Sequence, residues 1–219
     1  MADDIARILA AAVRRDPTRP LLTWYDDATG ERTELSGATL ANWVAKTANL
    51  LVDGLGLGSG DRAGVLLPPH WQSAAVLLGC WSAGVEVTRE KAPVEVLFAT
   101  AAAAGAHEAA AWSAGDRYAL SLDPFALPLR QVPPGWADFN REVRAYGDVY
   151  APVSPIVVDA AVDGLAPGDR VLIDTQRHRD PRDWLVGPLA AGASIVLCGH
   201  LDKAKLADRI AAERVTVER

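Results

Sequence analysis

The chain has 219 residues, half of them hydrophobic, and carries a formal net charge of −6 at pH 7. This length and composition are those of a globular protein with its own core, and they exclude a disordered chain. The negative net charge excludes a nucleic-acid-binding protein of the usual basic kind, because no uniformly basic surface is available to neutralise phosphates.

The first part of the chain is predicted to alternate helices and strands. Apolar residues at helical spacing predict a helix from Ile5 to Val13, and turn residues at 26–30 predict a hairpin of strands 21–25 and 33–35. Ser36 is expected to cap a second helix that runs to Leu55. The elements expected next are strand 62–67, helix 71–83, strand 85–87, strand 94–99, helix 101–112 and strand 117–122. Strands that alternate with helices indicate a parallel, helix-covered sheet.

The glycines from Gly54 to Gly60 resemble a nucleotide-binding loop in composition only. A phosphate cradle needs a strand, then glycines, then a helix whose N-terminus faces the anion. Here the expected order is helix, glycines, strand. We therefore predict an ordinary helix-to-strand connection in which glycine ends the helix.

A proline-rich segment, Asp123–Gly135, divides the chain. Beyond it the expected elements are strand 170–174, helix 182–190, strand 194–198, helix 202–213 and strand 215–217. The prediction is an α/β fold: one domain, 1–219, of two related subdomains, 1–130 and 136–219, each with a helix-covered, mostly parallel sheet.

The two halves share a repeat at a constant offset of 108 residues. Asp61-Arg62 and Gly84 in the first half match Asp169-Arg170 and Gly192 in the second, with no gap. Further identical pairs at the same offset are His70 and His178, Leu77 and Leu185, Gly79 and Gly187, and Ala83 and Ala191. We predict two copies of one strand–helix–strand unit; the alternative is chance matching of common turn residues.

Several of these segments carry a family resemblance. Gly58-Ser-Gly-Asp-Arg62, Leu78-Gly-Cys-Trp-Ser-Ala-Gly-Val85 and Gly187-Pro-Leu-Ala-Ala-Gly-Ala193 resemble the N-terminal part of the AMP-binding superfamily of acyl-adenylate-forming enzymes, which includes the acyl-CoA synthetases. The chain resembles short actinobacterial members of that superfamily. The resemblance covers most of the chain and implies the fold of that N-terminal part.

The segment that should bind phosphate departs from the family pattern. An active member carries a Ser/Thr/Gly-rich loop ending in Pro-Lys-Gly, whose amides and lysine hold the triphosphate. Residues 146–168 contain no Thr, no Lys and no run of Gly, and Asp148 would repel phosphate. The family places its adenine-, ribose- and metal-binding residues beyond the position of Arg219. We therefore expect no adenylation by this chain alone, and predict no catalytic, cofactor-binding or metal-binding residue.

His178 is the first candidate for a ligand pocket, because it aligns with a histidine that lines the acyl pocket in the resembled family. Trp184 and His70 are further candidate pocket-lining residues. The alternatives are an exposed histidine in the Arg/Asp-rich loop 177–183 and tryptophan packing in the core.

Other constellations are rejected. His178-Arg179-Asp180 lacks the companion motifs of a kinase, and Cys198-Gly-His200 lacks a third and fourth metal ligand. Cys80 and Cys198 show no disulfide or CxxC spacing, so a reducing cytoplasm is expected. No secretory signal is recognised, and the longest apolar run is too short to cross a membrane.

The sequence leaves three hypotheses for the function. The leading hypothesis is a non-catalytic remnant of an adenylate-forming enzyme with a protein-interaction or regulatory role, as a homodimer or with a protein partner. The alternative is a module that binds an acyl, CoA or nucleotide-like small molecule without adenylation. An enzyme of unrelated chemistry is the third, and no nucleophile–base pair supports it. No nucleic acid and no membrane is expected as a partner.

Overall fold

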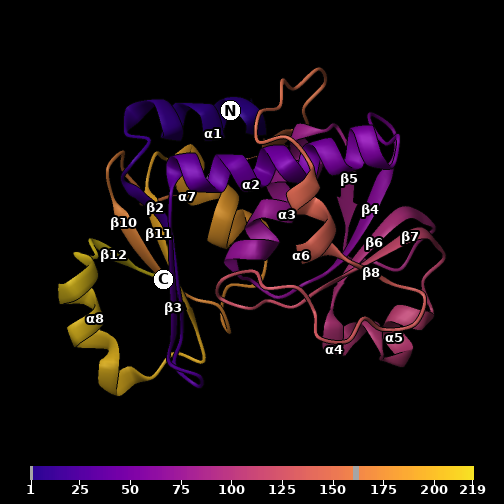
Figure 1. Ribbon diagram of the computed structural model, residues 1–219. Coiled ribbons are helices and arrows are strands. Elements are labelled where there is room, and N and C mark those ends of the chain that lie inside the picture. The colour runs from indigo at the N-terminus through magenta and orange to yellow at the C-terminus, as the bar shows by residue number, and fades with distance from the viewer. Residues whose placement is uncertain (1, 160–162) are drawn as a thin grey trace. The chain divides into compact units, whose positions relative to one another are not determined.

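The computed structural model describes residues 2–159 and 163–219 (Figure 1). The chain forms two compact units: unit 1 consists of Met1–Ala41, Pro69–Ala74 and Val157–Arg219, and unit 2 of Asn42–Pro68 and Ala75–Ile156. This division differs from the split expected at the proline-rich loop. The reason is strand pairing, because strand 20–26, near the start of the chain, pairs with strand 194–199, near its end.

Unit 1 is built on a five-stranded sheet in the order β12-β10-β11-β2-β3. β2 pairs with β11 in parallel and with β3 in antiparallel register, so the hairpin predicted from the turn residues 26–30 is confirmed. Its strands are β2 (Pro20–Asp26), β3 (Glu31–Ser36), β10 (Arg170–Asp174), β11 (Ser194–Gly199) and β12 (Val217–Glu218). A separate antiparallel pair joins β1 (Ala2–Asp4) to β9 (Val157–Asp159).

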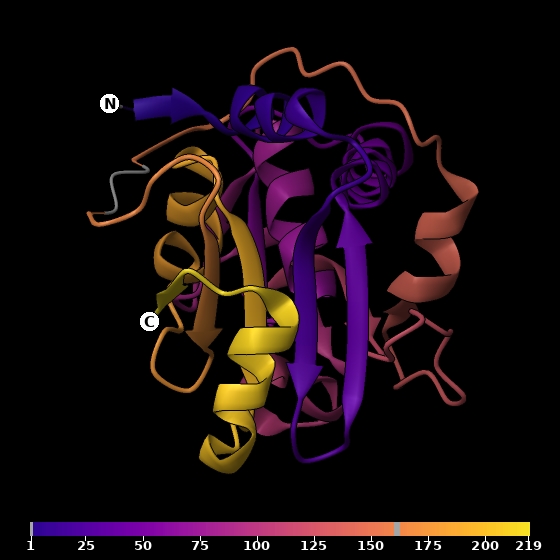
Figure 2. The ribbon, with the colours of Figure 1, turned by 90° about the vertical axis from the view of Figure 1, so that its left-hand side faces the viewer.

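The helices of unit 1 pack around this sheet. α8 (Leu206–Glu213) lies over one face, in front of the strands in Figure 2, and buries Leu172, Val196 and Cys198 beneath it. The π-helical turn η3 (Arg182–Val186) and α7 (Gly187–Ala190) contact β11, and α1 contacts α7. The remaining helical elements of the unit are α1 (Ile5–Arg15), the start of α2 (Gly37–Asn49), the start of α3 (Trp71–Ser82) and η4 (Lys203–Lys205).

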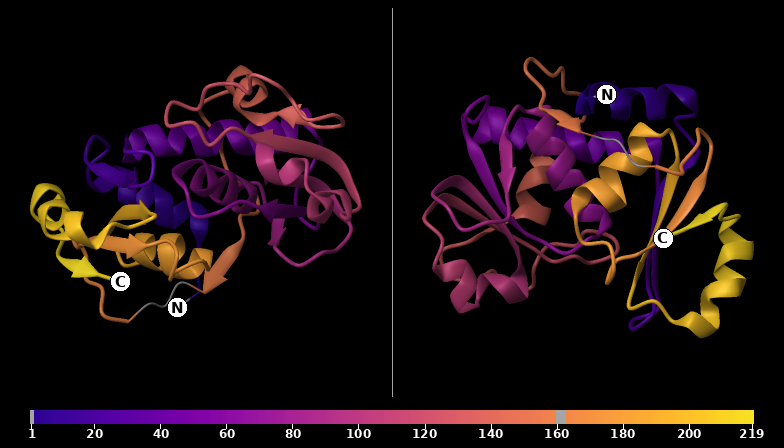
Figure 3. Two further views of the ribbon diagram at one scale, coloured as in Figure 1. Left: turned by 90° about the horizontal axis from the view of Figure 1, so that it is seen from below. Right: turned by 180° about the vertical axis from the view of Figure 1, so that it is seen from behind.

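Unit 2 holds a second five-stranded sheet, β5-β4-β6-β7-β8, in which every pair is parallel. Figure 3 shows the short helices α4 and α5 beyond the carboxyl end of β6. Its strands are β4 (Arg62–Leu66), β5 (Glu86–Thr88), β6 (Val94–Thr100), β7 (Ala114–Leu120) and β8 (Ala137–Asp138). Its helical elements are the end of α2, η1 (Leu50–Gly54), most of α3 (Trp71–Ser82), α4 (Ala101–Ala104), α5 (His107–Ala110), α6 (Phe139–Glu142) and η2 (Val143–Ala145).

The repeat predicted from the sequence recurs in the backbone. β4 and β5 pair Arg62 with Glu86, and β10 and β11 pair Arg170 with Ser194, which is the same register shifted by 108 residues. The turn before each first strand is closed in the same way, since Asp61 Oδ2 accepts from Gly58 N–H at 2.8 Å and Asp169 Oδ2 from Ala166 N–H at 2.7 Å. The glycine pairs 60/168 and 84/192 share positive φ angles of 98° and 97°, and of 82° and 75°. Both copies therefore have one element order and one register, as predicted; residues 160–162, which precede the second copy, lie outside the described part.

Most predicted elements are confirmed, with several differences. Residues 101–112 form two short helices, α4 and α5, because the chain turns at Gly105 instead of continuing one helix. The terminal strand is confined to Val217–Glu218, since Val215 and Thr216 bond α8 and β10 as a connection. β8 and α6, which follow the proline-rich loop, were not expected from the sequence. The glycines at 54–60 connect η1 to β4, which confirms the helix-to-strand reading.

Candidate binding pocket

A cavity of unit 1, here called the strand-end pocket, has a volume of about 690 Å³. It lies where β10 and β12 end, and open α/β sheets bind ligands at the carboxyl ends of their strands. Its volume is within the range of small-molecule sites. Leu172, Leu201 and Leu206 form an apolar floor. The charged and polar lining residues are Asp174, Arg177, His178, Lys203, Glu218 and Arg219.

Backbone hydrogen bonds fix the positions of the charged rim. The amides of Arg177 and His178 both donate to the carbonyl of Asp174, at 3.1 and 3.0 Å, which folds this turn over the end of β10. The amide of Asp174 donates to Arg219 O, and the amide of Arg219 to Leu172 O, at 3.1 and 2.9 Å. The rim residues are thus placed by the ends of two adjacent parallel strands.

The side chains of Arg177, His178 and Lys203 form no hydrogen bond or ion pair with another described residue, whereas the Arg219 guanidinium donates to the carbonyl of Asp163. The pocket is lined by three cations, Arg177, Lys203 and Arg219, and by two carboxylates, Asp174 and Glu218, so positive charge is in excess. Unpaired cations above leucines can hold a small anion that has an apolar part.

Of the three residues that the sequence singled out, only His178 lines this pocket. Trp184 belongs to η3 and is a core residue, only 1% exposed. His70 is 2% exposed, and its ring meets that of Trp24 edge-on with centroids 4.7 Å apart. Burial lowers the pKa of His70 to about 3, while Asp26 opposes this shift. Its Nδ1 accepts the amide hydrogen of Gln72 at 3.1 Å, so the ring is a neutral core group.

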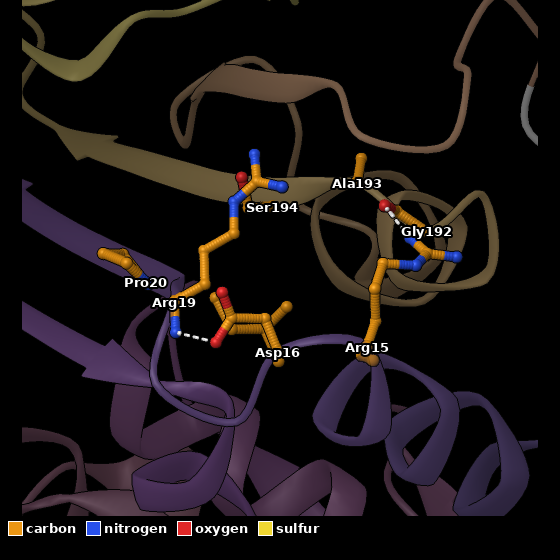
Figure 4. A pocket seen from close by; sticks show the side chains of 9 residues that line it. Arg15, Asp16, Arg19, Pro20, Gly192, Ala193 and Ser194 are labelled. Carbon is orange, nitrogen blue, oxygen red and sulfur yellow. Dashed lines mark hydrogen bonds between the residues drawn. The ribbon is translucent and has the colours of Figure 1, made fainter.

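A second, much smaller hollow of about 30 Å³ opens at the opposite ends of the strands (Figure 4). Arg15 Nη1 donates to Gly192 O at 2.7 Å and Arg19 Nη2 to Gly168 O at 3.3 Å. Asp16 Oδ1 accepts from the amides of Thr18 and Arg19. A hollow of this size has room for about one water molecule. Its charged groups bond the turns of the repeat, so we assign it a structural role.

A buried polar network, which the sequence reading missed, attaches α8 to the sheet. Glu213 accepts from Tyr25 Oη at 2.5 Å and from Arg32 Nη2 at 2.9 Å, and it also pairs with Arg170. Burial tends to raise the pKa of Glu213, but the hydrogen bonds from Tyr25, Arg170 and Arg32 outweigh it and lower the pKa to about 2. The spacing of an acid and an arginine at 213 and 209, one helical turn apart, was the available signal.

A second ion pair completes this attachment. Arg209 Nη1 and Nη2 contact the two carboxylate oxygens of Asp27 at 2.9 and 2.6 Å, and the guanidinium lies 4.2 Å from the Tyr25 ring centroid. The hydrogen bonds from Arg209 are the main cause that lowers the pKa of Asp27 to about 2. Because α8 carries Leu206, these contacts also hold part of the pocket floor.

Residues 146–168, in which the sequence analysis expects no phosphate loop, are mostly irregular in their described parts. Lys46 Nζ donates to Tyr146 O at 2.7 Å, and Asn49 Nδ2 donates to Gly147 O and Val149 O at 2.8 and 3.0 Å. Residues 146–156 run on as an irregular extended strap, and 157–159 form β9. Across 146–159 and 163–168 no glycine loop leads from a strand into a helix.

Residues 2–159 and 163–219 contain no group of three or more His, Cys, Asp or Glu side chains placed to hold a metal ion. His200 Nδ1 instead lies 2.9 Å from Asp26 Oδ1, and Cys198 lies under α8. No helix in this part of the chain is long and apolar enough to cross a membrane.

A Mycobacterium tuberculosis protein described as "TIGR03089 family protein" is 44% identical, and the match covers 95% of each chain. The chain belongs to the TIGR03089 family. Residues 9–89 also match the family model for AMP-binding enzymes, which relates the family to that superfamily.

Solved structures show the same fold. An acyl-CoA synthetase from Brucella canis is 19% identical with a TM-score of 0.70, and an acetoacetyl-CoA synthetase from Streptomyces lividans is 18% identical with a TM-score of 0.74. Each match covers 99% of this chain but only 50% and 42% of the synthetases. The chain thus spans about half of these enzymes and has the fold of their N-terminal part.

Proposed function

We propose that this TIGR03089 family chain binds a small organic anion in the strand-end pocket without forming an adenylate. The observation that carries the proposal is a group of three side chains, Arg177, His178 and Lys203, that form no hydrogen bond or ion pair within the described residues and lie above a leucine floor. The relationship to acyl-CoA synthetases supports carboxylates and acyl-CoA thioesters as the first ligands to test.

Binding is tested by thermal shift, because a ligand that binds only the native state raises its melting temperature. At least one of acetate, benzoate, octanoate and their CoA thioesters should raise the melting temperature of the wild type. The variant R177A/K203A should lose most of this rise. Lys91→Ala, which removes an exposed lysine of unit 2, is the matched control and should keep it. If no anion shifts the melting temperature, or if R177A/K203A responds like the wild type, the pocket is not the site.

That the chain does not adenylate carboxylates is a separate proposal with its own test. A transferring phosphate needs amides and cations placed around its developing charge. The strap at 146–156 offers carbonyls that are already bonded by Lys46 and Asn49, and no lysine of its own. We expect no carboxylate-dependent ATP–pyrophosphate exchange by the purified chain. Exchange that persists in repeated preparations, free of contaminating synthetases, would show that adenylation is retained.

Association with a second copy or a partner protein stays a prediction. β12 does form an edge of the unit 1 sheet, and it pairs with β10 at only two positions, Val217 and Glu218. Such a short, charged strand offers little backbone for pairing with another chain.

A further inference from the structure

The strand-end pocket is lined by side chains of both charges that do not neutralise one another. Within the described residues, Asp174 and Glu218 form no ion pair with any cation of this pocket. Asp174 Oδ1 accepts only the amide hydrogen of Gln176, at 3.0 Å, and the Glu218 side chain is exposed. Opposite charges that share a cavity without pairing leave both charges available to a ligand.

The negative charges come from the sheet. Leu172 and Asp174 lie two residues apart in β10, so their side chains emerge on the same face. Glu218 of β12 lies beside Leu172 in parallel register, and Leu172 packs under α8 (Figure 2). Both carboxylates therefore stand on the face that α8 covers, next to the leucine floor of the pocket.

The positive charges come from connections beyond the strand ends. Arg177 and His178 belong to the turn that is bonded to the carbonyl of Asp174. Lys203 begins η4, which follows β11 and leads into α8. The pocket thus has carboxylates on its strand side and cations on its loop side, with leucines between them.

A simple carboxylate would match only half of this lining. It would pair with Arg177 and Lys203 and leave the carboxylates of Asp174 and Glu218 without a partner. A ligand that also carries an ammonium group would pair with both walls. The ammonium group has three hydrogen-bond donors and no acceptor, which suits a wall of carboxylates. The cavity of about 690 Å³ has room for such a ligand.

Building on the proposed function, we propose that the anion of the strand-end pocket is a zwitterion, an α-amino acid with an apolar side chain. Its carboxylate binds Arg177 and Lys203, and its ammonium group binds Asp174 and Glu218. Its apolar side chain lies on the leucine floor. A site that hydrogen-bonds an ammonium group discriminates against analogues that lack this group, because its own acceptors are then left unpaired.

The test compares three ligands of nearly one skeleton by isothermal titration calorimetry at neutral pH. They are free leucine, isocaproate, which lacks only the ammonium group, and isoamylamine, which lacks only the carboxylate. The wild type should bind free leucine at least about tenfold more tightly than either analogue, the usual weight of one hydrogen bond to a charged group. Free alanine should bind more weakly than free leucine, because it covers less of the floor.

Two isosteric variants assign the preference to the carboxylates. D174N/E218Q should bind free leucine no more tightly than isocaproate, while its affinity for isocaproate should not fall, because two negative charges are removed. Glu218→Gln alone changes an exposed side chain and should lose part of the preference with an unaltered melting temperature. The control E86Q/D148N removes two exposed carboxylates of unit 2 and should keep the wild-type preference.

The outcomes separate this inference from the proposed function. If the wild type binds isocaproate as tightly as free leucine, or if D174N/E218Q keeps the preference, the zwitterion is overturned and the anion site stands. If neither free leucine nor isocaproate binds, the inference fails, and the proposed function is then decided by the other anions of its own test. If isoamylamine binds as tightly as free leucine, the cations contribute nothing and both proposals fail.

Discussion

His70 and His178 hold equivalent positions in the repeat but have opposite surroundings. The His70 ring is buried against Trp24, and its pKa falls from the usual 6.5 to about 3. His178 stays partly exposed on the rim of the strand-end pocket. One residue type at one repeat position therefore serves the core in one copy and a surface site in the other.

The His70 pKa predicts a pH dependence of stability. Between about pH 6.5 and pH 3 the unfolded state binds the proton and the folded state does not, so stability falls as the pH falls through this window. At about pH 5 the wild type should have lost roughly 2 kcal/mol of its unfolding free energy relative to about pH 7. Urea unfolding at the two pH values measures the loss. In His70→Asn the loss should largely disappear, whatever the variant's absolute stability.

The control is His178→Asn, which removes a histidine without altering the core. It should keep the wild-type difference between the two pH values. An undiminished difference in His70→Asn would mean that other groups cause the pH dependence.

At the scale of elements, α8 is attached to the sheet by charge as well as by its apolar face. Asp27 pairs with Arg209, and Glu213 with Arg170 and Arg32. Both carboxyl pKa values are lowered to about 2. The stabilisation from ionised carboxylates is complete above their unfolded values of 3.8 and 4.5, and it is lost as the pH falls toward 2.

Breaking one of these pairs should destabilise unit 1 strongly. Arg209→Met leaves the carboxylate of Asp27, whose side chain is 5% exposed, without its main partner. We expect a loss of about 3–5 kcal/mol in urea unfolding, the cost of an unpaired buried charge. The double variant D27N/R209M removes that charge and should recover part of the loss, which a double-mutant cycle would quantify. If the double variant is no more stable than Arg209→Met, the charge is not the cause.

At the scale of the whole molecule, the two copies of the repeat share one strand register, but different residues surround them. Gly84 and Gly192 both have positive φ, but a Cβ on Gly84 would lie 2.6 Å from the backbone carbonyl oxygen of Ser154. On Gly192 it would lie 2.5 Å from the Arg15 guanidinium. A guanidinium can move aside, whereas a backbone carbonyl can do so only with its chain.

Alanine at the two positions should therefore have unequal effects. Gly192→Ala should cost about 1 kcal/mol for the left-handed backbone, plus the Arg15 hydrogen bond. Gly84→Ala should cost more, because backbone must shift as well. Gly60→Ala and Gly168→Ala are the matched pair: their φ angles are 98° and 97°, and no atom lies within 4 Å of either Cβ. Urea unfolding should give these two the same cost; clearly different costs would count against equivalent backbones.

The sequence by itself determined the features that depend on neighbouring residues. Apolar spacing placed α1 and α3, turn residues placed the β2–β3 hairpin, and the 108-residue offset predicted two strand–helix–strand copies in one register. The helices and the hairpin follow from local hydrophobic pattern and turn residues, which a short window contains, whereas the offset follows from comparing the two halves of the sequence. The expectation that residues 146–168 hold no phosphate-binding loop also came from one continuous segment, and it stays a prediction.

Only the tertiary structure decided which distant residues meet. The strand-end pocket joins the ends of β10 and β12 to the start of α8, and β2 enters the sheet beside β11. The pairing of Asp27 with Arg209, and the burial of His70 and Trp184 while His178 stays at the surface, also depend on contacts between distant segments. A one-dimensional pattern gives the type and spacing of side chains. It does not give the strand order, and the strand order decides which of them share a site.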